Sequence, residues 1–448
     1  MRERIEAGEM ATSRPRRQFV VGTGGNALVG LGSTQANSEV RDATTFGALK
    51  LTLGATGYSW QFVKVGSSGK LADTGSGDLP LSRSCRSSLA NFSARISAVV
   101  GIPGGMMSSP AFVVVGIDNG GTSNNVTVMA DDGRYLIAQM LEVPSRVTEG
   151  PVRAVESLVE AMNLGLSTAG IDQSAVRSIG LDTPGPASAD GVMASKGGTN
   201  LGHPDWGGYD IRAALEHRTG LPVVYSNDGN AAALYAHHTF FGDEAATRSS
   251  VSAIVGTGLG GGVIEQGRIV KGAAGMAGEL GHVHIPMHGL LGPDQPVPVC
   301  NCGFVGDVES VASLTGIRLN LLPYWLGRYP GHELVGVDLS TASKKVRGLG
   351  ERGDEMARKI FEQQAMALGA LFTIAANFTD PDAYFVGGGV VEAEPEFRDW
   401  FVSTVRQHTQ LRAEQRDVAF SLVPDRDMAG ARGSAVAALT SLRGGASG

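Results

Sequence analysis

One carboxylate in this chain lies in a setting that suits proton transfer. Asp228 follows the apolar segment 223–226 and precedes an alanine-rich stretch, an order that predicts a strand, a tight turn and a helix. Beyond the end of a strand, its side chain could take the proton from a hydroxyl that attacks a phosphate, a role worth about 10² to 10⁴ in rate. The alternative is that Asp228 caps the helix, because Asp is favoured at that position.

Three glycine-rich segments could bind the phosphates of a nucleotide. Each follows an apolar, strand-like run, and glycine lets a backbone approach an anion because it has no Cβ. One such turn is weak evidence, but two in corresponding positions of a repeated pattern, with a third cluster, outline a nucleotide site. The residues expected to bind it are Gly120, Gly121, Thr122, Gly256, Thr257, Gly258, Gly260, Gly261, Gly387, Gly388 and Gly389.

Asp118 stands at the end of the strand that precedes the first glycine turn. A carboxylate there can hold Mg²⁺, usually through water, and the cation then neutralises the phosphates. The alternative is an Asp that caps the turn. Neither a Walker motif nor a dinucleotide-binding fingerprint is present, so the nucleotide is not expected to be held as in a P-loop enzyme.

Cys300 and Cys302 are separated by one residue in a glycine-rich loop, and His282 lies shortly before them. Two such cysteines with a histidine suit a structural zinc ion that pins the loop. Three cysteines in 448 residues cannot form a disulfide framework, which indicates a reducing compartment and a cytoplasmic location.

The elements that must position these residues occur twice. Strands are expected at residues 112–117 and 126–129, with a third near Tyr135, and the same order of strand, glycine turn and strand recurs at 251–255 and 263–265. Helices are expected at residues 152–164, 211–218, 230–241, 356–377 and 428–442. Alternating strands and helices predict an α/β fold in which two similar lobes, each a sheet covered by helices, enclose a cleft.

Composition changes near residue 80. We expect a strand-rich extension at 1–79, a linker at 80–111, a small lobe at 112–229 and a large lobe at 230–448, with the last helix packing back on the small lobe. Residues 15–78 resemble the C-terminal tail of calcineurin-like metallophosphoesterases, but the first 110 residues contain no histidine for a two-metal centre. The extension is therefore expected to be non-catalytic, as a gene-fusion remnant or an over-long reading frame that precedes Met106.

The net charge of −7 disfavours binding to nucleic acid. No run of eighteen apolar residues occurs, so no membrane span is expected.

Residues 113–448 resemble the ROK family of sugar kinases and sugar-responsive repressors. The matching segments occur in the family's order: 118–122, 182–186, 200–201, 227–233, 256–262, 279–282 and the cysteine loop that ends at Glu309. The resemblance implies a duplicated actin-like (ribonuclease H-like) ATPase fold. It also implies a glucokinase-like, ATP-dependent sugar kinase that forms a dimer or tetramer.

The same resemblance assigns residue roles. His282 would ligate zinc together with Cys300 and Cys302, and Asp228 would be the catalytic base. The sugar hydroxyls would be bound by Asn200, Asn227, Asp228, Glu279, His282 and Glu309.

Two departures from the family pattern affect these roles. Asp307 stands where a third zinc cysteine is usual, and a carboxylate is an acceptable zinc ligand; the alternatives are that His284 takes its place or that zinc binds weakly. Ser123 follows the first phosphate loop where a lysine is common. The nucleotide site then has one fewer cation, which leaves the choice of phosphoryl donor open.

The sequence leaves the sugar open as well. His203 and Trp206 are candidate specificity residues, with a solvent-facing histidine and a packing tryptophan as the alternatives. His237 and His238 are expected to be surface residues. A sugar-responsive repressor and a sugar sensor without catalysis are the rival functions, and each is disfavoured: the first by the strand-like pattern of residues 1–110, where a helix-turn-helix is required, and the second by intact Asp228 and phosphate loops.

Overall fold

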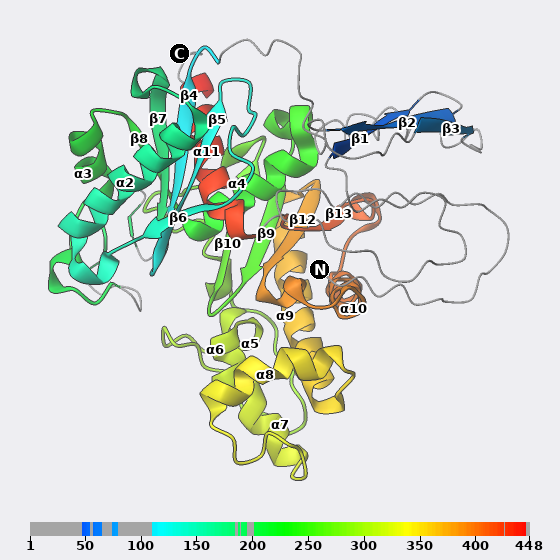
Figure 1. Ribbon diagram of the computed structural model, residues 1–448. Coiled ribbons are helices and arrows are strands. Elements are labelled where there is room, and N and C mark those ends of the chain that lie inside the picture. Colours follow the sequence, from blue (N-terminus) through cyan, green and yellow to red (C-terminus); the bar gives the residue numbers. More distant parts are fainter. Residues whose placement is uncertain are drawn as a thin grey trace. The chain divides into compact units, whose positions relative to one another are not determined.

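The computed structural model describes residues 47–53, 57–64, 74–78, 110–183, 187–188, 190–194, 201–424 and 426–444. The chain divides into two compact units, Met1–Ser108 and Ser109–Gly448 (Figure 1). The described part of the first unit is an antiparallel sheet in the order β1-β2-β3. Its strands are β1 (Gly47–Leu53), β2 (Gly57–Lys64) and β3 (Thr74–Asp78).

Three apolar runs in the extension, residues 19–21, 49–53 and 58–65, predict strands. The second and third coincide with β1 and β2, and the first lies outside the described residues. The resemblance of residues 15–78 to a metallophosphoesterase tail stays a prediction.

The second unit contains two five-stranded mixed sheets with the same connectivity. The first has the order β6-β5-β4-β7-β8 and the second β11-β10-β9-β12-β13. In each, the central strand pairs antiparallel with the strand that follows it and parallel with a later one. This α/β architecture is the duplication that the sequence predicts.

The first sheet consists of β4 (Val113–Asn119), β5 (Ser123–Ala130), β6 (Leu141–Pro144), β7 (Val176–Thr183) and β8 (Val223–Asn227). The second consists of β9 (Ser250–Val255), β10 (Leu259–Glu265), β11 (Arg268–Ile269), β12 (Ala383–Gly388) and β13 (Ala419–Leu422).

The longer helices are α2 (Pro151–Ala169), α3 (Ile211–Thr219), α4 (Asp228–Phe241), α8 (Leu339–Glu351), α9 (Glu355–Thr379), α10 (Pro395–His408) and α11 (Arg426–Gly444). Shorter ones are α5 (Glu309–Ala312), α6 (Leu314–Gly316) and α7 (Leu322–Arg328). None of the helices that the structure describes is long and apolar enough to cross a membrane.

The helices form layers around the two sheets of the second unit. α2 and α3 cover one face of the first sheet, and α11 covers the other. α11 also packs along α4, which in turn covers the second sheet. The two inner helices therefore stand between the sheets, and Figure 1 shows α11, in red, beside β4 and β5. α4 begins at Asp228, so this interior layer carries the candidate base.

Glycines allow α11 to lie unusually close to the first sheet. Side chains alternate along a strand, and on β4 Val113, Val115 and Ile117 pack toward α2, which leaves Gly116 on the α11 face. A Cβ at Gly116 would lie 2.0 Å from the carbonyl oxygen of Ala431, and one at Gly180 of β7 would lie 1.8 Å from that of Ser434. No side chain fits at either position.

Two local expectations are wrong. The third strand of the first half is not at Tyr135, which forms only an isolated bridge with Met129; its ring instead packs edge-on against Tyr235 of α4, and the strand follows at β6. His237 is not a surface residue. It is fully buried, and its ring nitrogens hydrogen-bond the Ser250 hydroxyl and the Ala245 carbonyl at 2.8 Å each.

Candidate active site

Asp228 is the first residue of α4, directly after β8. The cap of this helix is Asn227, whose Oδ1 accepts the backbone N–H of Asn230 at 2.7 Å. Asn227, and not Asp228, therefore caps this helix. Within the described part of the chain, Asp228 Oδ1 accepts a hydrogen bond from the adjacent N–H of Gly229 alone, and the side chain is exposed to solvent.

The pKa of Asp228 is raised to about 6. The main cause is burial, because the protein surrounds the carboxylate although solvent still reaches it; the charges of Asp118 and Glu279 add to the effect, and the Gly229 N–H opposes it. An accessible carboxylate with a pKa near neutrality is suited to accept a proton at physiological pH.

Asn227 also connects this position to the second half of the chain. Its Nδ2 donates to Glu279 Oε1 at 3.1 Å, and Glu279 directly precedes the short turn Leu280–His282. The approach is close because α4 and β10 meet through glycines: a Cβ at Gly229 would lie 2.6 Å from the Gly261 nitrogen. Asn200, the sixth expected sugar-binding residue, lies outside the described residues.

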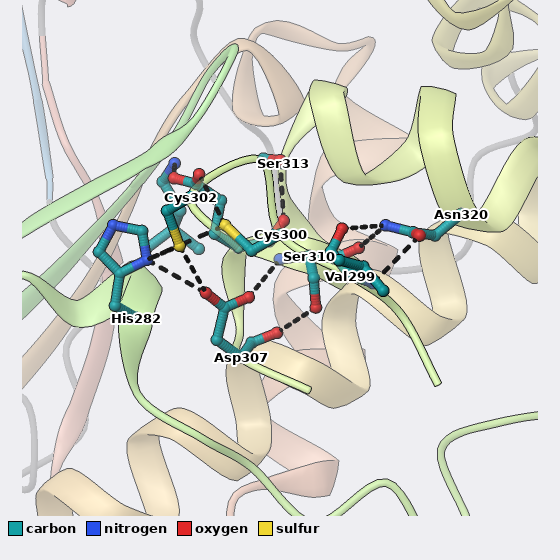
Figure 2. Close-up of polar contacts among 10 residues, drawn as sticks. His282, Val299, Cys300, Cys302, Asp307, Ser310, Ser313 and Asn320 are labelled. Atoms are coloured by element: carbon teal, nitrogen blue, oxygen red, sulfur yellow. Dashed lines mark hydrogen bonds and ion pairs between the residues drawn. The ribbon is translucent and has the colours of Figure 1, made fainter. Parts of the chain in front are cut away.

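Four side chains from two segments converge at the cysteine loop (Figure 2). The Nδ1 of His282 lies 3.1 Å from Asp307 Oδ2, 3.6 Å from Cys302 Sγ and 4.0 Å from Cys300 Sγ. Each of the four residues offers one ligand atom, and these four atoms lie within 4.8 Å of one another. His284 is exposed, and its ring packs 5.6 Å from that of Phe304.

This set fits a zinc ion by its chemistry, with two thiols, one imidazole nitrogen and one carboxylate oxygen. Asp307 is fully buried, and its other oxygen accepts the Ser310 N–H at 2.9 Å. The Ser310 N–H thus fixes the orientation of the Asp307 carboxylate toward the two thiols and the imidazole, as hydrogen bonds to ligating carboxylates do in metal sites.

Glu309 joins the cysteine loop to the second glycine turn. Its Oε2 accepts the backbone N–H of Leu259 at 2.8 Å, and its Oε1 lies 3.4 Å from Cys300 Sγ. Gly258 is against the same carboxylate, because a Cβ there would lie 2.8 Å from Oε2. Glu309 therefore lies between the candidate metal ligands and the candidate phosphate loop.

The glycines expected to bind the nucleotide divide into two groups. Residues 120–122 and 256–258 are in turns, whereas Gly260 and Gly261 belong to β10 and pack against the start of α4. Gly387 and Gly388 end β12, where Gly388 has a φ of +86° that favours glycine. Gly389 follows, and its carbonyl accepts a hydrogen bond from Arg347 of α8 at 2.5 Å.

Asp118 has a neighbour that the sequence patterns did not single out as a site residue. Asp182, near the end of β7, is fully buried, and it stands opposite Asp118 on the adjacent parallel strand. Burial and the adjacent Asp118 carboxylate raise the pKa of Asp182 well above its ordinary value. The signal that could have revealed the pair is the repeated Gly-x-Asp at 116–118 and 180–182.

The remaining candidates, Trp206, His203 and Ser123, contact neighbouring protein groups. Trp206 is almost fully buried and donates from its ring nitrogen to the Val147 carbonyl at 2.9 Å, as a packing residue does. His203 is partly exposed and lies against Gly150. Ser123, where a lysine is common, donates to Glu142 at 3.0 Å.

Comparisons with known proteins bear on the family and the fold of the chain. The profile of the ROK family matches residues 114–441. A glucokinase of Halalkalibacterium halodurans is 30% identical over 306 residues, which cover 67% of this chain and 86% of that protein. An N-acetylmannosamine kinase of Escherichia fergusonii is 31% identical over 62% of this chain and 83% of its own length.

Solved structures of such proteins share the fold. The ROK hexokinase from Thermus thermophilus superposes with a TM-score of 0.59 at 29% identity, covering 74% of this chain and all of that one. A ROK family glucokinase from Streptomyces griseus, in complex with glucose and AMPPNP, gives a TM-score of 0.53 at 26% identity, covering 73% and 99%. A ROK family transcriptional regulator, at 22% identity and a TM-score of 0.53, shows the common fold alone.

Proposed function

Because the chain belongs to the ROK family, we propose that it is a carbohydrate kinase that transfers the γ-phosphate of ATP to a hexose hydroxyl, with glucose as the sugar and glucose 6-phosphate as the product. The observation that carries the proposal is the setting of Asp228, an accessible carboxylate with a pKa of about 6 beside the Asn227–Glu279 pair. Glucokinases and an ATP-analogue complex among its relatives support the donor and the acceptor.

Asp228 acts as the general base in this proposal. It accepts the proton of the attacking sugar hydroxyl as the oxygen–phosphorus bond forms, and the leaving group is ADP. The carboxylates and amides of Asn200, Asn227, Glu279, His282 and Glu309 bind the other hydroxyls. Such groups discriminate strongly against a sugar that lacks a hydroxyl, because they would then be left unpaired.

The glycine turns at residues 120–122 and 256–258 bind the phosphates of the nucleotide, and Gly387–Gly389 contact its nucleoside. Asp118 holds Mg²⁺, which neutralises phosphate charge when it is bound. The backbone N–H groups of the two turns orient the phosphates between the sheets that carry them.

A structural zinc ion is held by His282, Cys300, Cys302 and Asp307. The Nδ1 of His282 faces the other three side chains, so its Nε2 remains for a sugar hydroxyl. Since Glu309 is in contact with Cys300, metal binding fixes two proposed sugar ligands at once.

N-acetylmannosamine is the second candidate sugar, because kinases of that sugar are among the relatives at about 30% identity. ATP and reduced thiols are both available in the cytoplasm, which supports that location. The family resemblance supports a dimer or tetramer, and light scattering on the purified protein tests it.

The test is ATP-dependent phosphorylation of a panel of hexoses and N-acetylhexosamines by the wild type and Asp228→Asn. We expect turnover of one sugar that falls at least about a hundredfold in the variant, while calorimetry shows that the sugar still binds. Absence of turnover of any sugar that binds would reject the kinase in favour of a sensor.

A further inference from the structure

Asp118 and Asp182 occupy equivalent positions on neighbouring strands. β4 and β7 are parallel, and their register pairs Gly116 with Gly180 and Asp118 with Asp182. Because side chains alternate along a strand, each aspartate projects from the same face as the glycine two residues before it. The two carboxyl groups therefore lie side by side on adjacent strands, on the face of the sheet that α11 covers.

α11 encloses this pair. A Cβ at Gly430 would lie 2.7 Å from the carboxyl carbon of Asp118, and the hydroxyl of Ser434, one turn further along, donates to Asp182 Oδ2 at 2.7 Å. Asp182 is fully buried, and its Oδ1 has no hydrogen-bond partner among the residues that the structure describes. Asp118 remains partly exposed beside the first glycine turn.

Burial of a carboxyl group costs folding free energy. If Asp182 served only to hold α11 against β7, a small neutral side chain would be sufficient. Ser434 of α11 donates to Asp182, and Asp118 stands opposite it on the neighbouring strand. The position of a second carboxyl group beside Asp118 is thus the feature that a purely structural role leaves unexplained.

We propose that Asp182 is a positioning residue for phosphoryl transfer: supported by Ser434 of α11, it fixes the rotamer of Asp118 toward the nucleotide's Mg²⁺. This inference rests on the proposed kinase function and adds a residue to it. Asp182 itself does not touch the substrate. It acts through Asp118, and the same helix packs along α4, which begins at Asp228.

A neutral hydrogen-bonding side chain of the same shape as Asp182 is sufficient to position Asp118. Asp182→Asn can accept from Ser434 and donate to Asp118, whereas Asp182→Ala can do neither. Ser434→Ala removes the support and leaves both carboxyl groups in place. Ser178→Ala is the matched control, because Ser178 is an equally buried serine on the same strand whose hydroxyl donates to the Pro222 carbonyl instead.

The experiment measures kcat and KM for MgATP and for the sugar, together with the binding of Mg·AMPPNP by calorimetry. We expect Asp182→Ala to lower kcat/KM for MgATP and to weaken Mg·AMPPNP binding about tenfold, the factor that one hydrogen bond to a charged group is worth. KM for the sugar stays within about twofold, since no sugar-binding group moves. Asp182→Asn restores most of the loss, and Ser434→Ala gives an intermediate value.

Three results overturn the proposal. In the first, Asp182→Ala leaves nucleotide binding and kcat/KM unchanged. In the second, Asp182→Asn is as damaging as Asp182→Ala, which would mean that charge and not position is required. In the third, Ser178→Ala has the same effect as Ser434→Ala, which would make the role one of packing.

The calorimetric arm separates this proposal from the proposed function. A wild type that phosphorylates no sugar but binds Mg·AMPPNP, with weaker binding in Asp182→Ala, rejects the kinase and retains the positioning role. A wild type that does not bind Mg·AMPPNP rejects both.

Discussion

Asn227 donates a hydrogen bond to Glu279 at 3.1 Å, and this bond joins the end of β8 in the first sheet to the segment that follows β11 of the second. The bond places a carboxylate from one half of the duplicated unit beside Asp228, which belongs to the other. Because Glu279 is one of the charges that raise the pKa of Asp228, the two halves together determine when the candidate base is ionised.

The pH dependence of the reaction follows from the ionisation of Asp228. A general base must be deprotonated, and the pKa of this carboxyl is about 6. We therefore expect kcat/KM for the sugar to be constant near pH 7.5 and to fall about tenfold for each pH unit below about 6. Initial rates from pH 5 to 8 check this, and a rate that is flat down to pH 5 would exclude Asp228 as the base.

Glu279→Gln removes a negative charge from the surroundings of Asp228. The acidic limb of the pH profile should then move to lower pH, because less repulsion opposes ionisation. KM for the sugar should rise about tenfold, since one charged hydrogen-bond acceptor is lost. Glu362→Gln is the control: Glu362 is exposed on α9 and pairs only with Lys359 among the described residues, so its replacement should change neither quantity.

Asp228 should also reduce stability at neutral pH. Its folded-state pKa of about 6 lies above its ordinary value of 3.8, so the folded state binds more protons in that window and loses stability as the pH rises through it. Asp228→Asn cannot ionise. With allowance for its solvent exposure, we expect the variant to be more stable than the wild type by on the order of 1 kcal/mol at pH 7 and equal to it near pH 4. Urea denaturation at both pH values measures this, and an equal difference at the two would contradict it.

Much of this architecture follows from local sequence patterns. The apolar runs at β4 and β9, each followed by glycines, predict the duplicated sheets, and the Cys-x-Cys loop with His282 predicts three members of the metal cluster. Asp307 is assigned through the family resemblance and not from a local pattern. Patterns of that kind also predict helices α4 and α9 to within a few residues at their ends.

The features that sequence reasoning missed depend on tertiary contacts. Tyr135 is of a residue type that is favoured in strands, but it packs on Tyr235 and lies outside the strands of the sheet. His237 looks polar, yet Ser250 and the Ala245 carbonyl satisfy both ring nitrogens in the interior. Asp182 meets Ser434 from 252 positions away, a distance at which no local pattern is informative.

The fourth metal ligand can be assigned by zinc content. If Asp307 holds the ion, Asp307→Ala should lose bound zinc at least about tenfold more readily than the wild type, and Asp307→Cys should retain it. His284→Ala should behave as the wild type, because His284 is not among the residues whose ligand atoms converge at the cluster. Elemental analysis after graded chelation, with the melting temperature as a second readout, distinguishes the two residues. Loss of zinc in His284→Ala alone would transfer the role to His284.

The close approach of α11 to the first sheet should be sensitive to a single methyl group. Ala at position 180 would place its Cβ 1.8 Å from the Ser434 carbonyl, so α11 would have to move away from β7. We expect Gly180→Ala to destabilise the protein by about 1–3 kcal/mol, as overpacking does, and to lower activity because the Ser434–Asp182 hydrogen bond is stretched.

Gly348→Ala is the matched control. Gly348 lies inside α8, and a Cβ added there would lie 3.5 Å from the Arg352 side chain, an ordinary van der Waals distance. Alanine is favoured over glycine inside a helix by about 0.5–1 kcal/mol. The same substitution should therefore have opposite signs at the two positions when unfolding is followed in urea. Equal tolerance at both would mean that α11 does not depend on the glycine at position 180, and that the arrangement of Ser434 over Asp182 is not fixed by this packing.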